Sequence, residues 1–182
     1  MTMQVKGRQR HSQLVQAAVG LLLEQGPGAL THRAVAARAG CSLSATTYYF
    51  ASLTDLAAAA GTEVVGRWAD QAEAVAARVN EHTGRQERIA AAVEALLPAA
   101  DRVRGHYEHL AGAGRSTAVA AAYADGRSRV DAAIARIVGP LGLDPAIAVA
   151  IIDGAAVSAL SEGRDPAALA RDLLAAVCRP RE

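Results

Sequence analysis

The chain has 182 residues, enough for one large domain or two small ones, and 52% of them are hydrophobic. Alanine supplies much of that content and aromatic residues only 3%, a composition that favours helices over strands. The net charge of +1 excludes no class of partner by itself. Because no segment shows strand alternation, we expect an all-α fold of about nine helices.

The two cysteines, Cys41 and Cys178, lie far apart without metal-binding or redox spacing, which is typical of a reducing compartment. The N-terminus lacks the apolar core of a secretory signal, and no uncharged apolar run reaches membrane-spanning length. We therefore expect a cytoplasmic protein with no membrane partner, no metal and no cofactor. Cys41 is interpreted as a small apolar residue rather than a redox sensor.

A first helix is expected from about Gln9 to Gln25, and the sequence Gly26-Pro27-Gly28 ends it. Residues 1–60 hold five Lys and Arg residues against two carboxylates, whereas carboxylates are in excess in the rest of the chain. Three of these cations, Lys6, Arg8 and Arg10, form a basic arm at its start. Such an arm either contacts DNA phosphates or the minor groove, or is a solvated tail, and charge alone favours neither.

Residues 31–56 predict two short helices joined by a tight turn, followed by the start of a longer helix. Thr31 and Ser42 are suitable N-caps for the two short helices, and Gly40 ends the first of them. Ser52 and Asp55 form a start that resembles a capping box. This is the helix-turn-helix pattern, whose second helix enters the DNA major groove. An ordinary helical hairpin with solvated polar residues is an equal alternative on the pattern alone.

The outward positions of the second short helix are candidates for DNA contact. Ser and Thr hydroxyls bond to base edges or phosphates, and a Thr methyl can meet a thymine methyl. With the basic arm and the start of the first short helix, the candidates are Lys6, Arg8, Arg10, Thr31, His32, Arg33, Ser42, Leu43, Ser44, Thr46, Thr47, Tyr48 and Tyr49.

Residues 8–56 resemble the DNA-binding domain of the TetR family of bacterial transcriptional regulators. The residues in register with the family pattern are Thr31, Val35, Ala36, Ala39, Gly40, Cys41, Ser42, Tyr49, Phe50, Ser52 and Leu56. Two positions depart from it. Thr47 stands where the family commonly has Tyr, which leaves open which aromatic reads a base. Leu53 replaces a commonly basic residue and so removes an expected phosphate contact.

Six further helices are expected, over about Ser52–His82, Gln86–Leu97, Asp101–Gly112, Ser116–Val138, Pro145–Ser161 and Pro166–Cys178. The first of these would be roughly 40 Å long, which suits a connector between domains. The sequence thus predicts a helix-turn-helix DNA-binding domain over residues 1–52, extended by the start of the fourth helix to about residue 60. An effector-binding and dimerisation domain is predicted over residues 53–182.

The resemblance implies an effector site in the middle helices. Aromatic walls with a few polar groups suit a small-molecule pocket, so the candidates are Trp68, His106, Tyr107, His109 and Tyr123. Taken singly, each aromatic is better explained by ordinary core packing. His106 and His109 have a spacing that can bind a metal, but no third ligand follows, so no metal site is predicted.

The helix expected over Pro145–Ser161 is apolar nearly all round and should be buried, in its own core or against a second copy of the chain. The resemblance favours a homodimer, in which the last two helices of each copy form a four-helix interface across a two-fold axis. Such symmetry implies a palindromic operator. The candidate interface residues are Ile147, Ile151, Ile152, Ala155, Ala159, Leu169, Leu173 and Val177.

An enzyme is not expected, because the chain has no nucleophile elbow, zinc-protease motif, paired CxxC or dinucleotide fingerprint. We expect a sequence-specific DNA-binding transcriptional regulator, a repressor that an unknown small-molecule effector releases from a palindromic operator. The alternatives are a ligand-independent DNA-binding dimer, an activator and, less favoured, a small all-α enzyme.

Overall fold

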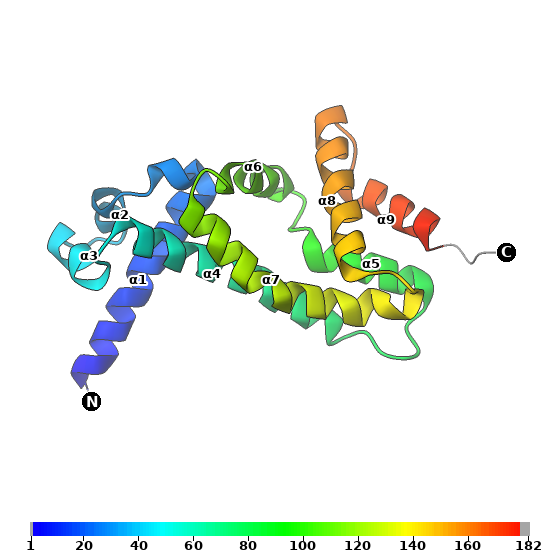
Figure 1. The fold of residues 1–182 in the computed structure, drawn as a ribbon, viewed down its shortest axis with the longest axis horizontal. Coiled ribbons are helices and arrows are strands. Elements are labelled where there is room, and N and C mark those ends of the chain that lie inside the picture. The colour runs from blue at the N-terminus through cyan, green and yellow to red at the C-terminus, as the bar shows by residue number, and fades with distance from the viewer. Residues whose placement is uncertain (1, 179–182) are drawn as a thin grey trace. The chain divides into compact units, whose positions relative to one another are not determined.

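The computed structural model describes residues 2–178, with side chains from residue 6 onward, and this part of the chain is all helical (Figure 1). The described residues form nine α-helices, so the expected fold class and number of helices are confirmed. The helices are α1 (Thr2–Gln25), α2 (His32–Arg38), α3 (Leu43–Tyr49), α4 (Leu53–Ala76), α5 (Arg85–Leu96), α6 (Val103–Ala113), α7 (Thr117–Val138), α8 (Pro145–Glu162) and α9 (Pro166–Val177). Two short 3-10 turns, η1 (Pro27–Ala29) and η2 (Gly139–Leu141), follow α1 and α7.

The helices divide into two compact units, each with its own core. The N-terminal unit comprises Met1–Gly66 and Gly105–Gly126, and the C-terminal unit comprises Arg67–Arg104 and Arg127–Glu182. Both α4 and α7 therefore contribute residues to each unit. The division places α6 and the start of α7 with the helix-turn-helix, whereas the sequence predicted a domain boundary between residues 52 and about 60.

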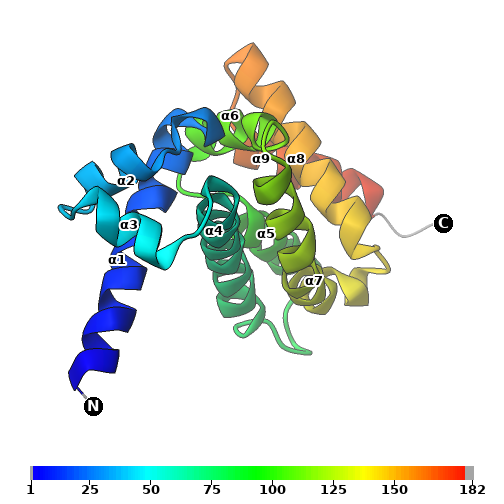
Figure 2. The same ribbon diagram turned by 60° about the vertical axis from the view of Figure 1, so that its left-hand side comes forward.

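Small residues bring α4 and α7 close together in the N-terminal unit (Figure 2). A Cβ added at Gly61 would lie 2.9 Å from the Cβ of Ala122, and one added at Gly126 would overlap the side chain of Val65. The two glycines therefore allow a backbone approach that larger residues would block. The Ala-rich composition thus shapes the packing as well as favouring helices.

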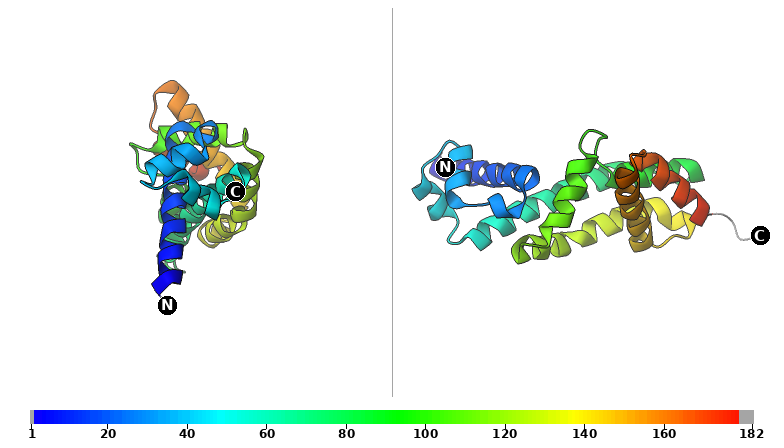
Figure 3. Two further views of the ribbon diagram at one scale, coloured as in Figure 1. Left: turned by 90° about the vertical axis from the view of Figure 1, so that its left-hand side faces the viewer. Right: turned by 90° about the horizontal axis from the view of Figure 1, so that it is seen from above.

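In the C-terminal unit, α8 and α9 form a helical hairpin that packs on α5 (Figure 3). Asp144 caps α8 and Asp165 caps α9, since each carboxylate accepts hydrogen bonds from two backbone N–H groups of the first turn. The predicted starts of both helices at Pro145 and Pro166 are confirmed. One face of α8 is buried within the unit, through Ala148, Val149, Ile152, Ala155, Ala156 and Ala159.

A buried arginine joins the start of α5 to the end of α7 in the C-terminal unit. Arg88 is 6% exposed, and its guanidinium donates to the carbonyls of Thr83 at 3.0 Å and Ile137 at 3.1 Å, and also to that of Asn80. Ile137 lies in the last turn of α7, where unpaired carbonyls carry the negative end of the helix dipole. Carbonyl groups therefore compensate a charge that has no carboxylate partner in the described residues.

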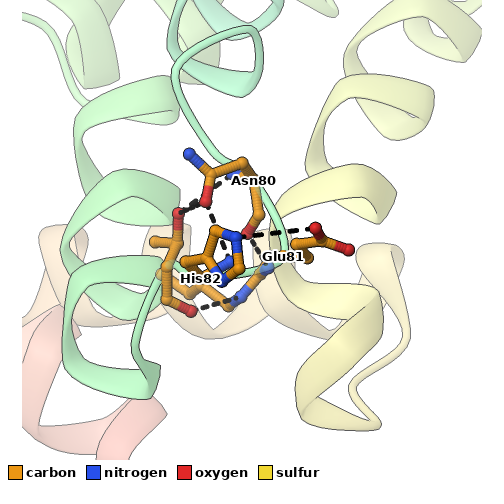
Figure 4. A network of polar contacts seen from close by, with 5 residues as sticks. Asn80, Glu81 and His82 are labelled. Carbon is orange, nitrogen blue, oxygen red and sulfur yellow. Dashed lines mark hydrogen bonds and ion pairs between the residues drawn. The ribbon is translucent and has the colours of Figure 1, made fainter.

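The loop between α4 and α5 is held by its own side chains (Figure 4). Asn80 Oδ1 accepts from the backbone N–H of His82 at 2.9 Å, and Thr83 Oγ1 accepts from the backbone N–H of Asn80, also at 2.9 Å. The side chains of Glu81 and His82 are exposed to solvent, with 3.5 Å between His82 Nε2 and Glu81 Oε1. The loop thus presents the carbonyls of Asn80 and Thr83 to Arg88.

Two helix boundaries differ from the sequence predictions. The first helix begins at Thr2 rather than near Gln9, so the basic residues Lys6 to Arg10 lie on a helix and not in a tail. No proline and no positive-φ residue interrupts the described part of this stretch, so the helix continues through it. In contrast, α4 ends at Ala76 rather than near His82, because residues 77–84 turn back toward Arg88.

By length and composition, α8 is the described helix that meets the requirements of a membrane span, with a mean hydropathy of 1.4 over 18 residues. One such helix is weak support for a membrane, since a buried core helix has the same composition. Here a third of its residues are buried inside the chain, and Asp153 lies in its middle.

Candidate nucleic-acid interface

The turn between α2 and α3 is built by three local signals. Thr31 Oγ1 accepts from the N–H of Ala34 at 3.0 Å, and Ser42 Oγ accepts from the N–H of Ala45 at 3.3 Å, so both predicted N-caps are confirmed. Gly40 adopts a φ of 63°, which side chains disfavour, and ends α2 there. The result is a helix-turn-helix with α3 as its second helix.

Arg38 joins α2 to α1, because its charge is paired with the Glu24 carboxylate of α1. Its guanidinium makes two hydrogen bonds to the Glu24 carboxylate, one of 2.7 Å, and this pairing lowers the pKa of Glu24. It reaches Glu24 by lying across Gly20, where an added Cβ would be 2.6 Å from a guanidinium nitrogen. This ion pair fixes the helix-turn-helix on α1.

The exposed face of α3 carries fewer hydroxyl groups than the sequence predicted. Tyr48 is 82% exposed, and Leu43, Ser44 and Thr47 are exposed beside it. The Thr47 hydroxyl donates to carbonyls of its own helix at 3.2–3.3 Å. Thr46 is fully buried, and its Oγ1 lies 3.9 Å from Cys41 Sγ, so the structure removes Thr46 from the DNA-contacting candidates.

Tyr49 faces back toward α1. Its ring packs edge-on against His11 with centroids 6.1 Å apart, and its hydroxyl lies beside Gly7. At the start of α2, Arg33 is exposed, whereas His32 is half-buried and its Nδ1 is without a hydrogen-bond partner in the described residues. The Thr31 hydroxyl is occupied as a cap, although the residue itself is exposed.

A groove of about 810 Å³ brings the basic arm and α3 together. Lys6 and Arg10 line it from α1, and Ser42, Ser44 and Tyr48 line it from the other side. Arg8 is exposed but does not line the groove. Two cations beside hydroxyls and an exposed aromatic ring are suited to a phosphate backbone and the adjacent base edges.

The effector candidates fall into both units. His109 is 4% exposed and joins three helices of the N-terminal unit. Its Nδ1 donates to the Leu22 carbonyl at 3.2 Å, so its Nε2 accepts from the Tyr123 hydroxyl. Tyr107 is buried and its ring contacts that of His106, whereas Trp68 belongs to the C-terminal unit. A pocket lined by all five residues therefore stays a prediction.

Burial perturbs the titration of this cluster. It lowers the pKa of His106 to about 4, with a further contribution from neighbouring His109, and it also lowers the pKa of His109. Burial raises the pKa of Tyr123 above its usual range. All three groups are therefore held neutral near pH 7. Among the described residues, no group of three or more His, Cys, Asp or Glu side chains is placed to hold a metal.

The interface candidates divide between a buried and an exposed face. Ile152, Ala155 and Ala159 lie in the core of their own unit, so they do not belong to a surface. Ile147 is 52% exposed, Leu173 and Val177 are exposed, and Ile151 and Leu169 are half-buried. Val157, which is not among the predicted interface candidates, is 55% exposed and, like Ile147, lies outside the buried face of α8.

Residues 14–62 match the sequence model of the bacterial regulatory proteins of the tetR family, which spans the helix-turn-helix and the start of α4. No curated protein sequence matches the chain. Among solved structures, the multidrug binding protein EbrR in complex with ethidium is 26% identical, with a TM-score of 0.67. That alignment covers 94% of this chain and 99% of EbrR.

Two other solved structures are less similar in sequence and show the fold alone. A transcriptional regulator from Saccharomonospora viridis, in complex with choline, is 20% identical with a TM-score of 0.69, covering 92% of this chain and 94% of that one. A TetR-family regulator from Mesorhizobium loti is 19% identical with a TM-score of 0.68, covering 94% of both chains.

The helix-turn-helix, its basic groove and the all-helical remainder define a DNA-binding transcriptional regulator fold. Within that class, residues 14–62 match the tetR-family model, in agreement with the residues in register over 31–56, and the whole chain is similar in fold to solved regulators. A regulator fold of this kind favours a protein that is not an enzyme.

Proposed function

We propose that the chain is a cytoplasmic transcriptional repressor that binds a palindromic operator as a homodimer and is released from it by a small-molecule effector. The observation that carries the DNA-binding part is the groove between α1 and α3. There, Lys6 and Arg10 stand beside Ser42, Ser44 and Tyr48, so phosphate-binding cations flank the second helix of the helix-turn-helix.

The open face of the α8–α9 hairpin supports the homodimer. Ile147 and Val157 of α8 and Leu173 and Val177 of α9 are exposed apolar side chains on one hairpin. Obligate dimer interfaces have apolar centres of this kind, and a two-fold axis lets the same patch cover itself. Two helices from each copy would form a four-helix interface. A dimer then presents two α3 helices to half-sites about one DNA turn apart.

The effector part is supported by the relatives. EbrR has been solved with ethidium, proflavin and malachite green, and the Saccharomonospora viridis regulator with choline. We infer a two-state mechanism in which the effector binds better to the conformation whose α3 helices do not match the half-site spacing. Release then requires a coupling free energy of about 1–3 kcal/mol between the two sites.

The test of DNA binding is selection of bound sequences from random double-stranded DNA with the full chain. We expect a palindromic consensus with half-sites about one helical turn apart. The double variant Lys6→Ala/Arg10→Ala should weaken binding to all sequences alike and lower the salt slope by about one for each phosphate that is no longer neutralised. Arg102→Ala, in the loop before α6, is the control. Enrichment of no common sequence would contradict the proposal.

A further inference from the structure

A cleft of about 910 Å³ lies within the N-terminal unit and is not used by the proposed DNA contacts. The end of α1 and the turn η1 form one wall, the start of α4 lies at its base, and α6 with the start of α7 forms the other wall. Its volume is in the range of small-molecule sites, roughly 300–1,000 Å³.

The cleft is open in part because two of the four positions on the α6 face that lines it are glycines. Gly105, Glu108, His109 and Gly112 are spaced at i, i+3, i+4 and i+7, so they share the face that lines the cleft. A Cβ added at Gly105 or Gly112 would meet no atom within 4 Å. The space is therefore open without any rearrangement of the helices.

The floor of the cleft is apolar and incompletely covered. Leu23 is 38% exposed and Leu53 is 42% exposed, and both line the cleft beside buried Leu30 and Ala57. These are large apolar side chains exposed on the N-terminal unit away from the α3 face. An apolar group placed on them would remove that area from water. Leu53 stands where a basic residue is common in the family. Instead of a phosphate contact, it supplies apolar surface to the cleft.

Two opposite charges in the lining are unpaired. The side chains of Glu108 and Arg115 form no ion pair or hydrogen bond with another described residue, and both residues are exposed, whereas the third charged residue in the lining, Glu24, is paired with Arg38. Arg115 lies in the turn after α6, seven residues beyond Glu108, which is more than the i, i+4 spacing at which side chains of one helix meet directly. A ligand that carries both charges would bridge them.

We propose that this cleft binds an amphipathic zwitterion, namely an amino acid or an amino-acid-like molecule with an apolar side chain. Its carboxylate pairs with the Arg115 guanidinium, its ammonium group pairs with Glu108, and its side chain covers Leu23 and Leu53. His109 forms part of the wall and is already held by Leu22 and Tyr123, so the wall is preformed. The inference concerns a ligand site and does not depend on the proposed operator binding.

The test compares three probes that share one apolar body. Isothermal titration calorimetry of the full chain with tryptophan, tryptamine and indole-3-propionate varies only the charged groups. We expect tryptophan to bind about tenfold or more tightly than either singly charged analogue, because each lacks one charge-assisted hydrogen bond. Phenylalanine and leucine vary the apolar body and should bind in the same range. Equal binding of tryptamine or indole-3-propionate, or no binding by any of the amino acids, overturns the proposal.

Charge variants assign the two ends of the ligand. In Glu108→Gln, tryptophan should lose its advantage over indole-3-propionate, and in Arg115→Gln it should lose its advantage over tryptamine. Arg104→Gln, an exposed arginine of α6 outside the cleft, is the matched control and should keep wild-type discrimination. Unchanged discrimination in both cleft variants places the ligand elsewhere and refutes the assignment.

A third variant fills the cleft without removing any polar group. Gly112→Leu adds a side chain into open space on a helix, where leucine is also the better helix former. We expect a melting temperature at or above that of the wild type and a loss of tryptophan binding by tenfold or more. Ala111→Leu, on the neighbouring exposed position, should bind normally. Normal binding by Gly112→Leu would exclude the cleft as the site.

Discussion

Tyr48 and Tyr49 are adjacent in sequence but have opposite surroundings. Tyr48 is 82% exposed on α3, whereas Tyr49 packs on His11 of α1. The aromatic available to DNA is thus displaced by one residue from Thr47, the position that the family commonly gives to Tyr. The hydrogen of the Thr47 hydroxyl is bonded within its own helix, so this hydroxyl is not free to donate to a base.

We expect Tyr48→Ala to weaken operator binding by about 1–3 kcal/mol without lowering the melting temperature, because the side chain makes few contacts within the chain. Tyr49→Ala should instead lower the melting temperature, since it removes the packing of α3 on α1. Fluorescence anisotropy with the selected operator and thermal unfolding measure the two effects. If both variants lost affinity equally at unchanged stability, the two side chains would not have separate roles.

His106 and His109 should make folding stability depend on pH. Burial lowers both pKa values below the unfolded value of about 6.5, so the unfolded chain binds protons first as the pH falls. Stability is then fully present above about pH 6.5 and decreases toward about pH 4, the region of the folded pKa of His106. Urea unfolding at several pH values should show this loss, and His106→Gln should flatten it. An unchanged slope in the variant would contradict this assignment.

At the residue scale, the sequence predicted the capping roles of Thr31 and Ser42 because a local hydrogen bond fixes them. It could not predict that Thr46 is buried or that Arg38 is paired with Glu24. Both depend on which face of a short helix meets α1, and seven residues are too few for a clear period. Gly20 was the available signal for the path of Arg38, but a mid-helix glycine has many causes.

At the element scale, the carbonyl ends of helices in the C-terminal unit are satisfied by arginines. Arg88 donates to a carbonyl at the end of α7, Arg136 donates to Ala76 at the end of α4 at 3.4 Å, and Arg85 donates to Ala175 in the last turn of α9 at 2.7 Å. The guanidinium groups thus join ends of helices that are distant in sequence.

We expect Arg88→Met to destabilise the chain by at least about 2 kcal/mol, because it leaves several buried carbonyls without a donor. Arg78→Met is the matched control. Arg78 pairs with Glu94 on the surface, where an ion pair contributes roughly 0–1 kcal/mol. Urea unfolding at neutral pH measures both. If both variants lost the same free energy of unfolding, the buried Arg88 would contribute no more to stability than a surface ion pair, and the prediction would be wrong.

The helix boundaries show where local signals are sufficient. The starts of α8 and α9 were predicted correctly because an Asp cap followed by Pro specifies them within three residues. The end of α4 was placed several residues too late, because nothing local stops it. The chain turns there to meet Arg88, which comes from the next helix, so the cause is a tertiary contact.

At the scale of the whole molecule, the apolar face of the α8–α9 hairpin should decide the oligomeric state. We expect Val157→Asp to shift a dimer to monomer and to weaken operator binding, since two half-sites would no longer be bound together. Ala111→Asp, on an exposed position of α6, should remain dimeric. Analytical ultracentrifugation distinguishes the states. If Val157→Asp remained a dimer, or if the wild type were a monomer, the proposed interface would be wrong.

The sequence predicted the all-α fold and the helix-turn-helix, since both follow from composition, caps and a dense local pattern. The sequence did not predict the division into the two units of the structure, because α4 and α7 each contribute to two cores. The cleft beside α6 was also missed. The cleft depends on two glycines, Gly105 and Gly112, and glycines on a helix do not add to the pattern of apolar residues from which a sequence is interpreted.

The division into units also separates the chromophores of the chain. The one tryptophan, Trp68, lies in the C-terminal unit, whereas the tyrosines Tyr48, Tyr49, Tyr107 and Tyr123 lie in the N-terminal unit. Indole fluorescence therefore reports on one unit, and tyrosine ultraviolet absorbance reports on the other, with no label added. The unmodified protein can thus reveal whether its two cores melt together or in sequence.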